Sequence, residues 1–297
     1  MTIKVGKPGK LLFPDDGITK ADLAGYYSAV AKAMLPHVRD RPIMMQRYPD
    51  GIGGEPIVQQ RAPDYFPPWI KRAKVKRQAG GTVTHALINN EDTLVFLVDQ
   101  ACITPHVWLS RADKPERPDQ MIFDLDPPAG KFALAREAAR AVREVLDRVG
   151  LPAFVKTTGG KGLHVHVPLD RRAGFDEVRA FAREVAEIVA RKSPQRFTTE
   201  QRKPKRRGRL YLDIMRNGYA QTAVPPYAVR GRKGAPVATP LAWEELDDAR
   251  LKPERFTLKT VQRRLAAGTD PWRGLARQAC ALGPARRRLQ TLEANIS

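Results

Sequence analysis

Cysteine is scarce in this chain: Cys102 and Cys280 are the only two among 297 residues, and they lie far apart. Both occur in apolar segments that we expect to be helical, so a disulfide framework and a zinc ribbon are excluded. The sequence has no apolar run near the roughly 20 residues that a membrane-spanning helix needs. It also starts without a signal-peptide pattern. We therefore expect a cytoplasmic protein with no membrane partner.

Acidic residues are in short supply, because 32 Asp and Glu accompany 52 Lys and Arg, a formal net charge of +20. A field of this sign attracts polyanions, and nucleic acid is the usual one. The basic residues gather at 71–77, 202–209 and 286–288. A single cluster of this kind is more often a solvated face or a loose end than a binding groove. The charge therefore favours a nucleic-acid partner without locating the contact.

The length allows two modest domains or one large one, and no repeat or low-complexity linker divides the chain. A capping box at Thr19 and Asp22 predicts a helix that ends at Pro36. Strands are expected at 42–48 and 82–88, and a buried helix at 91–103. These elements form a small N-terminal α/β module over approximately residues 1–110. We expect it to belong to a single domain that spans 1–297.

The central part, approximately 111–250, alternates strands with helices. Strands are expected at 121–126, 153–157, 163–169 and 209–214, and helices at 132–149 and 175–191. This order predicts a sheet that helices cover on one face, which leaves the other face for substrate. The tail, 251–297, is expected to be helical in parts, with a loosely ordered basic end.

Two carboxylates, Asp124 and Asp126, lie on the first of these strands, which stops at a proline pair. Side chains alternate along a strand, so both carboxylates point one way while Phe123 and Leu125 point into a core. Two anions roughly 7 Å apart repel each other unless a cation lies between them. The pair therefore suits hard divalent metal ions. The alternative is a strand with an acidic exposed face.

A glycine-rich turn at 158–162 contains Lys161 and leads into a strand on which His164 and His166 share a face. Glycines let the backbone approach a phosphate, and the lysine supplies the opposite charge. The turn is not a Walker loop, because no Ser or Thr follows the lysine. A flexible hairpin is the alternative. The histidines lack further ligands at zinc spacing, so polar contacts to a substrate are favoured.

A third carboxylate, Asp213, lies on a strand between apolar neighbours and needs a partner. A shared metal ion is one answer, and Arg206 or Arg209 is the other. Farther on, Arg230 and Arg232 are spaced by two, so they face the same way in an extended segment and suit phosphate oxygens. Ordinary basic surface is the alternative. Serine nucleophile chemistry has no support, because no serine lies in a Gly-x-Ser-x-Gly elbow.

Together these motifs resemble the archaeo-eukaryotic primase superfamily, most closely the polymerase domain of bacterial DNA ligase D. The resemblance rests on Asp-Leu-Asp, Thr-Gly-Gly-Lys-Gly-Leu-His, a strand Asp and Arg-Gly-Arg, and runs from about Lys10 to Trp272. It implies an α/β primase-polymerase fold, in which an RRM-like catalytic sheet covered by helices carries a smaller N-terminal α/β module.

The resemblance also implies a nucleotidyltransferase that extends a primer 3′-hydroxyl at DNA breaks or short gaps, often with ribonucleotides. Asp124, Asp126 and Asp213 would be catalytic and hold two ions, Mn²⁺ or Mg²⁺. The residues matching positions around the incoming NTP or dNTP are Thr158, Lys161, His164, Arg230, Arg232, His106 and Arg206. Lys10 and Lys20 match the pair that holds a 5′-phosphate of DNA. The implied partners are Ku and a separate DNA ligase, in a bacterial or archaeal, nucleoid-associated setting.

Two departures from the family pattern stand out. Thr158 replaces the usual serine and keeps the hydroxyl, and Ile57 with Val58 replaces an aromatic pair that packs on the template. Base stacking contributes about 1–3 kcal/mol per base, so template binding is expected to be weaker or differently arranged. The alternative functions are a primase that starts chains de novo and a non-catalytic module that binds DNA ends.

Overall fold

The computed structural model describes residues 3–268 and 270–294. They divide into two compact units, each assembled from separate stretches of chain. Of the described residues, unit 1 takes those up to Pro115 together with Thr222–Thr239 and Glu254–Asp270. Unit 2 takes Glu116–Gln221, Pro240–Pro253 and the residues from Pro271 onward. Each unit therefore combines segments that lie far apart in the sequence.

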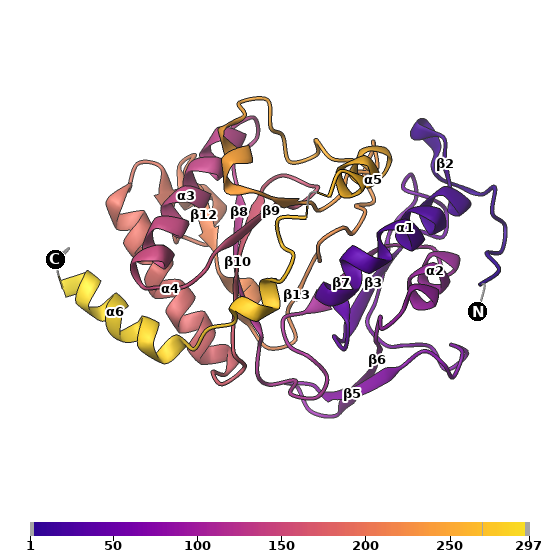
Figure 1. The fold of residues 1–297 in the computed structure, drawn as a ribbon, viewed down its shortest axis with the longest axis horizontal. Helices are drawn as coiled ribbons and strands as arrows, with labels where there is room; N and C mark the ends of the chain where they lie inside the picture. The colour runs from indigo at the N-terminus through magenta and orange to yellow at the C-terminus, as the bar shows by residue number, and fades with distance from the viewer. Residues whose placement is uncertain (1–2, 269, 295–297) are drawn as a thin grey trace. The chain divides into compact units, whose positions relative to one another are not determined.

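Unit 2 is built on a six-stranded sheet with the order β11-β12-β8-β10-β9-β14. Its strands are β8 (Gln120–Asp126), β9 (Phe154–Thr157), β10 (Leu163–Pro168), β11 (Phe197–Thr198), β12 (Leu210–Asp213) and β14 (Pro240–Leu241). Its helices are α3 (Phe132–Arg148), α4 (Phe175–Lys192) and α6 (Leu282–Ala294), with short 3₁₀ helices η2 (Lys203–Arg206), η3 (Met215–Asn217), η4 (Trp243–Asp247) and η5 (Leu275–Gln278). Helices α3 and α4 run along this sheet (Figure 1).

Side-chain alternation explains why one face of this sheet meets the helices. Phe123, Leu125 and Val165 are fully buried, and the adjoining helices present alanines and valines at helical spacing. The polar residues of β8 and β10 lie on the other face, as the period of two requires. The predicted acidic strand is thus confirmed as a strand with a buried apolar side.

Unit 1 contains a four-stranded sheet with the order β13-β7-β3-β4 and two separate strand pairs, β1-β2 and β5-β6. The strands are β1 (Leu11–Phe13), β2 (Ile18–Thr19), β3 (Ile43–Arg47), β4 (Ile57–Gln59), β5 (Arg72–Lys76), β6 (Thr82–Ala86), β7 (Cys102–Trp108) and β13 (Thr222–Ala223). The helices are η1 (Pro14–Asp16), α1 (Lys20–Val38), α2 (Glu91–Asp99) and α5 (Leu258–Ala266). A single apolar core unites α1, α2 and the four-stranded sheet.

The capping box that Thr19 forms with Asp22 is present at the start of α1, as predicted. The predicted end of that helix was wrong, because Pro36 lies inside the last turn and the helix continues to Val38. A proline so close to the end removes only one intrahelical hydrogen bond, which the packing of Val38 in the core offsets.

The predicted helix at 91–103 was also wrong at its end. Helix α2 stops at Asp99, and Ala101 takes a left-handed backbone (φ 59°) that turns the chain into β7. Cys102 therefore lies in a strand, and Cys280 forms an isolated bridge to Leu169 rather than part of a helix. Density of apolar residues alone does not separate a buried helix from a buried strand.

The basic end of the tail is ordered as helix α6, contrary to the expectation of a loose end. Leu282, Ala285 and Leu289 are buried, and α6 packs on α4. Arg288 donates to the carbonyl oxygen of Val149 at 2.8 Å. An apolar stripe between the arginines therefore fixes this segment on unit 2.

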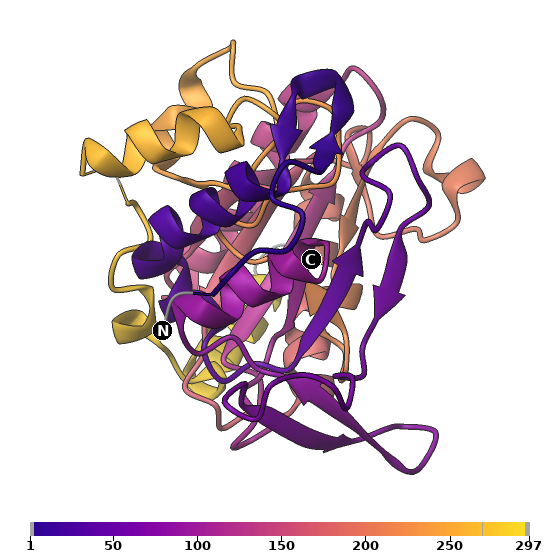
Figure 2. The same cartoon turned by 90° about the vertical axis from the view of Figure 1, so that its right-hand side faces the viewer.

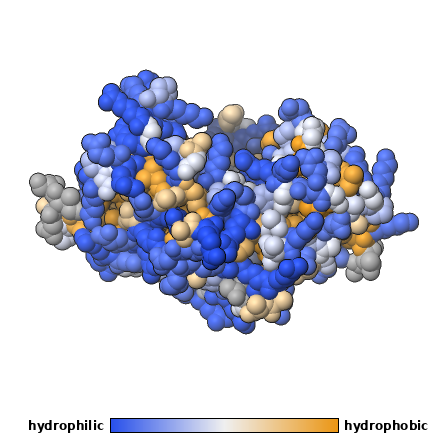
Figure 3. Space-filling model, turned by 90° about the horizontal axis from the view of Figure 1, so that it is seen from above, coloured by the Kyte–Doolittle hydropathy of each residue, from blue (hydrophilic) through white to orange (hydrophobic). Residues whose placement is uncertain are grey.

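The first basic cluster forms β5 of a two-stranded hairpin, which is visible as an extended ribbon in Figure 2. The face seen in Figure 3 is mostly hydrophilic, with small scattered apolar areas. No helix among the described residues is long and apolar enough to cross a membrane.

Candidate active site

Four predicted or neighbouring polar residues form a row across the sheet of unit 2. In register, Lys156 of β9 pairs with His164 of β10, His164 with Asp124 of β8, and Asp124 with Asp213 of β12. Directly paired residues share a face, with α-carbons about 4.5–5.5 Å apart. Asp126 lies two residues along β8 from Asp124 and so points to the same face.

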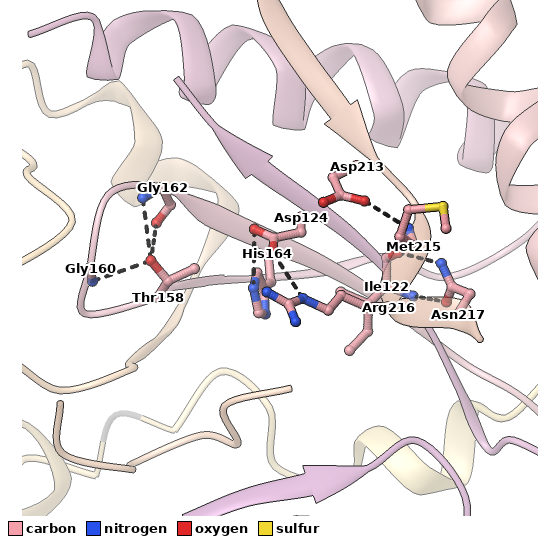
Figure 4. A network of polar contacts seen from close by, with 10 residues as sticks. All are labelled: Ile122, Asp124, Thr158, Gly160, Gly162, His164, Asp213, Met215, Arg216 and Asn217. Atoms are coloured by element: carbon pink, nitrogen blue, oxygen red, sulfur yellow. Dashed lines mark hydrogen bonds and ion pairs between the residues drawn. The ribbon is translucent and has the colours of Figure 1, made fainter. Parts of the chain in front are cut away.

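Asp124 is held by two cationic or polar neighbours (Figure 4). Its Oδ1 lies 3.4 Å from Nε2 of His164, and Nε of Arg216 donates to its Oδ2 at 3.3 Å. Burial would raise the pKa of the Asp124 carboxyl, but the His164 ring and the Arg216 guanidinium outweigh burial and hold the pKa well below its usual range. Asp124 is therefore an anion at neutral pH.

His164 is itself almost fully buried, with 3% of its surface exposed. Burial and the charge of Lys156 lower the pKa of His164 to about 4, against the pull of Asp124. The ring is therefore neutral at pH 7, and Arg216 supplies the positive charge beside Asp124.

Asp213 shows the electrostatic cost of placing two carboxylates face to face. Its pKa is raised, first by burial and also by the charge of Asp124, although Oδ1 accepts a 2.7 Å hydrogen bond from the Met215 backbone N–H. Like charges on paired strand positions disfavour each other. A cation between them would relieve this cost.

The predicted glycine turn is closed by the Thr158 side chain (Figure 4). Its hydroxyl donates to the carbonyl oxygen of Gly162 at 3.1 Å and accepts the N–H groups of Gly160 and Gly162. Lys161 is exposed at the tip. The hydroxyl that a serine would also offer thus has a structural role in the turn.

Gly162 lies so close to β8 that no other residue fits. A Cβ there would stand 2.1 Å from the carbonyl oxygen of Leu125 and 2.7 Å from Oδ1 of Asp126. The last glycine of the turn is therefore needed for contact with the acidic strand. From the sequence, the glycines were interpreted only as residues that let the backbone approach a phosphate.

Lys156 and Arg216 were missed by sequence reasoning. Lys156 has no exposed surface although its side chain ends in an amino group. In the sequence it is a single charged residue in a short strand, which gives no sign of this burial. Arg216 follows Asp213 by three residues in η3, where Asn217 bonds both backbone groups of Ile122. A buried lysine opposite a histidine was visible only once the strand register was known.

Arg206 lies in the basic loop of unit 2 and stacks over the ring of Tyr211 at 4.2 Å. Its Nε and Nη2 donate to the carbonyl oxygens of Glu200 and Gln201. Three donors of Arg209 likewise bond to loop carbonyls. Neither arginine forms an ion pair with Asp213 in the contacts described, so the structure does not support the arginine alternative for that carboxylate.

His106, Arg230 and Arg232 belong to unit 1. His106 lies on β7, and Thr104, on the same face of that strand, donates to the carbonyl oxygen of Val229 at 2.7 Å. Unit 1 thereby brings β7 beside the segment that carries both arginines. Gly231 between them packs on Tyr48, where a Cβ would stand 2.4 Å from the ring.

Lys10 and Lys20 also lie in unit 1 and are brought together by the β1-β2 hairpin. The N–H of Lys20 donates to the carbonyl oxygen of Lys10 at 2.8 Å. The Lys20 ammonium bonds to Oδ1 of Asp99 and to the carbonyl oxygen of Gly6. An ammonium has three donors, so these two contacts leave one unused, and only 9% of the Lys20 surface is exposed.

The three carboxylates Asp124, Asp126 and Asp213 are the candidate ligands for a divalent ion. Among the described residues, no three His, Cys, Asp or Glu side chains are gathered closely enough to hold a metal as they stand. The donor type nevertheless fits Mg²⁺ or Mn²⁺, and the paired positions of Asp124 and Asp213 require a counter-charge. A bound ion would compete with His164 and Arg216 for the Asp124 carboxylate.

Comparison with known proteins identifies relatives across most of the chain. The family profile "LigD, primase-polymerase domain" matches residues 19–272. The multifunctional non-homologous end joining protein LigD of Pseudomonas aeruginosa is 35% identical over 289 residues, 96% of this chain and 34% of the relative. The bifunctional LigD of Bacillus subtilis is 32% identical over 85% of this chain and 40% of its own length. This chain thus spans about a third of the length of such relatives.

A solved structure agrees with these sequence matches. The polymerase domain of Mycobacterium tuberculosis Ligase D, in complex with DNA, superimposes with a TM-score of 0.88 at 32% identity. The match covers 94% of this chain and 99% of that domain. The expected α/β primase-polymerase fold is therefore confirmed.

Proposed function

Because the chain belongs to the LigD primase-polymerase domain family, a family of metal-dependent nucleotidyltransferases, we propose that it extends DNA primers at breaks or short gaps. The basic charge of +20 suits a DNA substrate. The relative from M. tuberculosis was solved in complex with DNA, which supports the same partner here.

One observation carries this proposal most directly. Asp124 and Asp213 occupy paired positions on neighbouring strands, and Asp126 faces the same way. Three carboxylates lie on one sheet face, and the pKa of Asp213 is raised first by burial and further by the charge of Asp124. This arrangement favours a cationic ligand over an acidic surface.

Asp124, Asp126 and Asp213 would hold two divalent ions, Mg²⁺ or Mn²⁺. Such ions supply charge that activates a primer 3′-hydroxyl and stabilises the leaving pyrophosphate. In the reaction the 3′-oxygen bonds to the α-phosphorus as the bond to the bridging oxygen breaks. Pyrophosphate leaves with that electron pair, and the hydroxyl proton passes to solvent.

The remaining polar residues are proposed to bind the incoming nucleoside triphosphate. Lys161 at the exposed turn and the guanidinium groups of Arg230 and Arg232 suit phosphate oxygens. Thr158 shapes the turn, as its hydrogen bonds indicate. His164, His106 and Arg206 complete the proposed set.

Lys10 and Lys20 are proposed to hold the 5′-phosphate on the far side of a gap. Their backbone contact and the remaining donor of Lys20 support this role. We further propose a partnership with Ku and a separate DNA ligase, since the relatives are named as end-joining proteins. A preference for ribonucleotides is also proposed, and it rests on the family resemblance alone.

Nucleotide incorporation on gapped DNA tests the catalytic assignment. With Mn²⁺ or Mg²⁺, the wild-type protein should extend the primer, and Asp124→Asn should lose extension while it keeps its fold. Glu293→Gln, a carboxylate change on α6, serves as the matched control and should stay active. Extension by Asp124→Asn at the wild-type rate would refute the assignment.

The 5′-phosphate claim needs a paired substrate. Gaps with and without the 5′-phosphate should differ in extension by the wild type, and Lys10→Ala combined with Lys20→Ala should remove that difference. Because Lys20→Ala also breaks the contact with Asp99, Asp99→Asn controls for loss of local structure. A phosphate effect that survives in the double variant would contradict the claim.

A further inference from the structure

The segment that carries Arg230 and Arg232 runs through the interior of unit 1 before it reaches the surface. Ala228 and Val229 are fully buried, while Arg230 is partly exposed and Arg232 exposed. Backbone hydrogen bonds link this segment to residues 236–238, with Tyr227 N–H to Ala238, Ala238 N–H to Ala228 and Arg230 N–H to Pro236. These bonds fix the residues on either side of Val229.

The backbone N–H and carbonyl oxygen of Val229 itself take no part in these hydrogen bonds with residues 236–238. Val229 forms an isolated antiparallel bridge with Val237, and its N–H and carbonyl oxygen bond instead to side chains. A buried backbone N–H or C=O group without a hydrogen-bond partner destabilises the folded protein. The two side chains that bond Val229 therefore decide where the backbone next to Arg230 lies.

Tyr27 of α1 supplies one of these partners. Its hydroxyl accepts the N–H of Val229 at 3.1 Å and donates to the carbonyl oxygen of Ile103 at 2.7 Å. Thr104 supplies the other and donates to the carbonyl oxygen of Val229 at 2.7 Å. Both side chains are buried, with 1% and 0% of their surface exposed. One residue of the arginine segment is thus fixed at both backbone groups.

The Tyr27 hydroxyl links three parts of unit 1 at one oxygen: α1, the strand β7 that carries His106, and the arginine segment. Burial raises the pKa of Tyr27 far above its ordinary value. The group therefore stays a neutral hydroxyl that donates and accepts at once. Phenylalanine would fill the same volume but form neither bond.

Neighbouring contacts fix the same segment from its other end. Tyr26 donates to the carbonyl oxygen of Tyr227 at 2.9 Å, and Tyr227, which has a left-handed backbone (φ 67°), donates to Oδ1 of Asp270. A non-glycine residue in that region is disfavoured unless its surroundings hold it. The anchoring is thus spread over several buried hydroxyls, with Tyr27 nearest to Arg230.

We propose that Tyr27 is a positioning residue that fixes Arg230, through the Val229 backbone, for the binding of a nucleoside triphosphate. This inference rests on the nucleotide role proposed for Arg230. The same positioning role is assigned to Thr104, which bonds the carbonyl oxygen of Val229.

The test combines nucleotide binding with amide exchange in the full chain. Titration with ATP and Mn²⁺ should show about tenfold weaker binding for Tyr27→Phe, and hydrogen exchange at the Val229 amide should be at least about tenfold faster. Thr104→Val should weaken nucleotide binding as well, and Thr104→Ser, which keeps the hydroxyl, should restore it.

Thr93→Val is the matched control for lost stability. Thr93 in α2 is equally buried, and its hydroxyl donates to Asn90 at 2.7 Å. Thr93→Val should lower the melting temperature without changing nucleotide affinity. Wild-type affinity in Tyr27→Phe, or an equal loss in Thr93→Val, would overturn the proposal.

Arg230→Ala separates this inference from the function on which it rests. If Arg230→Ala binds nucleotide as the wild type does, the role proposed for Arg230 fails, and Tyr27 loses its positioning task with it. If Arg230→Ala loses binding and Tyr27→Phe does not, only the positioning inference fails.

Discussion

Gly162→Ala is the substitution for which the structure gives the sharpest expectation. The added methyl carbon would lie 2.1 Å from the carbonyl oxygen of Leu125 and 2.7 Å from Oδ1 of Asp126. The Asp126 side chain could rotate away. The Leu125 oxygen is part of the backbone and pairs in register with β10, so it has no such freedom.

Relief therefore requires the ends of β8 and β10 to separate where Asp126 lies. Overpacking in a well-packed interior usually costs about 1–3 kcal/mol, and a backbone overlap belongs at the upper end. For a unit of this size, about 3 kcal/mol corresponds to a melting temperature lower by roughly 6–12 °C. Primer extension should fall more steeply than stability, because the displaced strand carries the proposed metal ligands.

Differential scanning calorimetry and primer extension on the same preparation measure both effects. Gly25→Ala is the control, since Gly25 is an exposed residue inside α1 and nothing stands within 4 Å of its Cβ position. That change should be neutral or slightly stabilising. Equal melting temperatures and equal extension for the two variants would refute the argument from close approach.

Three further expectations follow from named groups. Thr158→Ala should open the glycine turn and weaken nucleotide binding while Thr158→Ser does not, which a titration with nucleotide checks. Burial lowers the pKa of His85 below 6.5. The free energy of unfolding should therefore fall as pH drops below about 6.5, because the unfolded chain binds a proton that the folded chain does not. When urea unfolding is measured from pH 8 to 5, the free energy of unfolding should depend less on pH in His85→Gln than in the wild type, and an equal pH dependence would contradict this. Burial raises the pKa of Cys102 to about 12. Iodoacetamide at pH 8 should therefore modify Cys280 in the native protein, and Cys102 only after unfolding. Rapid modification of Cys102 in the native protein would contradict its burial.

The sequence predicted the parts of the fold that depend on local pattern. The strand with Asp124 and the helices after it have clear periods, and residue spacing alone placed Asp124 and Asp126 on one face. Their pairing with Asp213 could not be derived, because strand order depends on contacts across some 90 residues of chain. The family resemblance supplied that association.

Other features were beyond reach for the same reason. Lys156 and Arg216 gain meaning only from the strands and turn that lie beside Asp124 and His164. The end of α2 was misjudged because apolar density is similar in a buried helix and a buried strand. Gly162 was noticed, but the backbone oxygen that excludes a side chain there lies on another strand.

The bond between Tyr27 and Val229 has a consequence for how the protein is made. The two residues are 202 positions apart in the chain, so at about 5–20 residues per second the tyrosine leaves the ribosome roughly 10–40 s before its partner. During that interval helix α1 lacks the segment that completes its buried contacts, although α2, on which it packs, has already been synthesised. Such long-range closure slows folding. The apolar core of unit 1 is therefore complete only after its late segments, Thr222–Thr239 and Glu254–Asp270, have been synthesised.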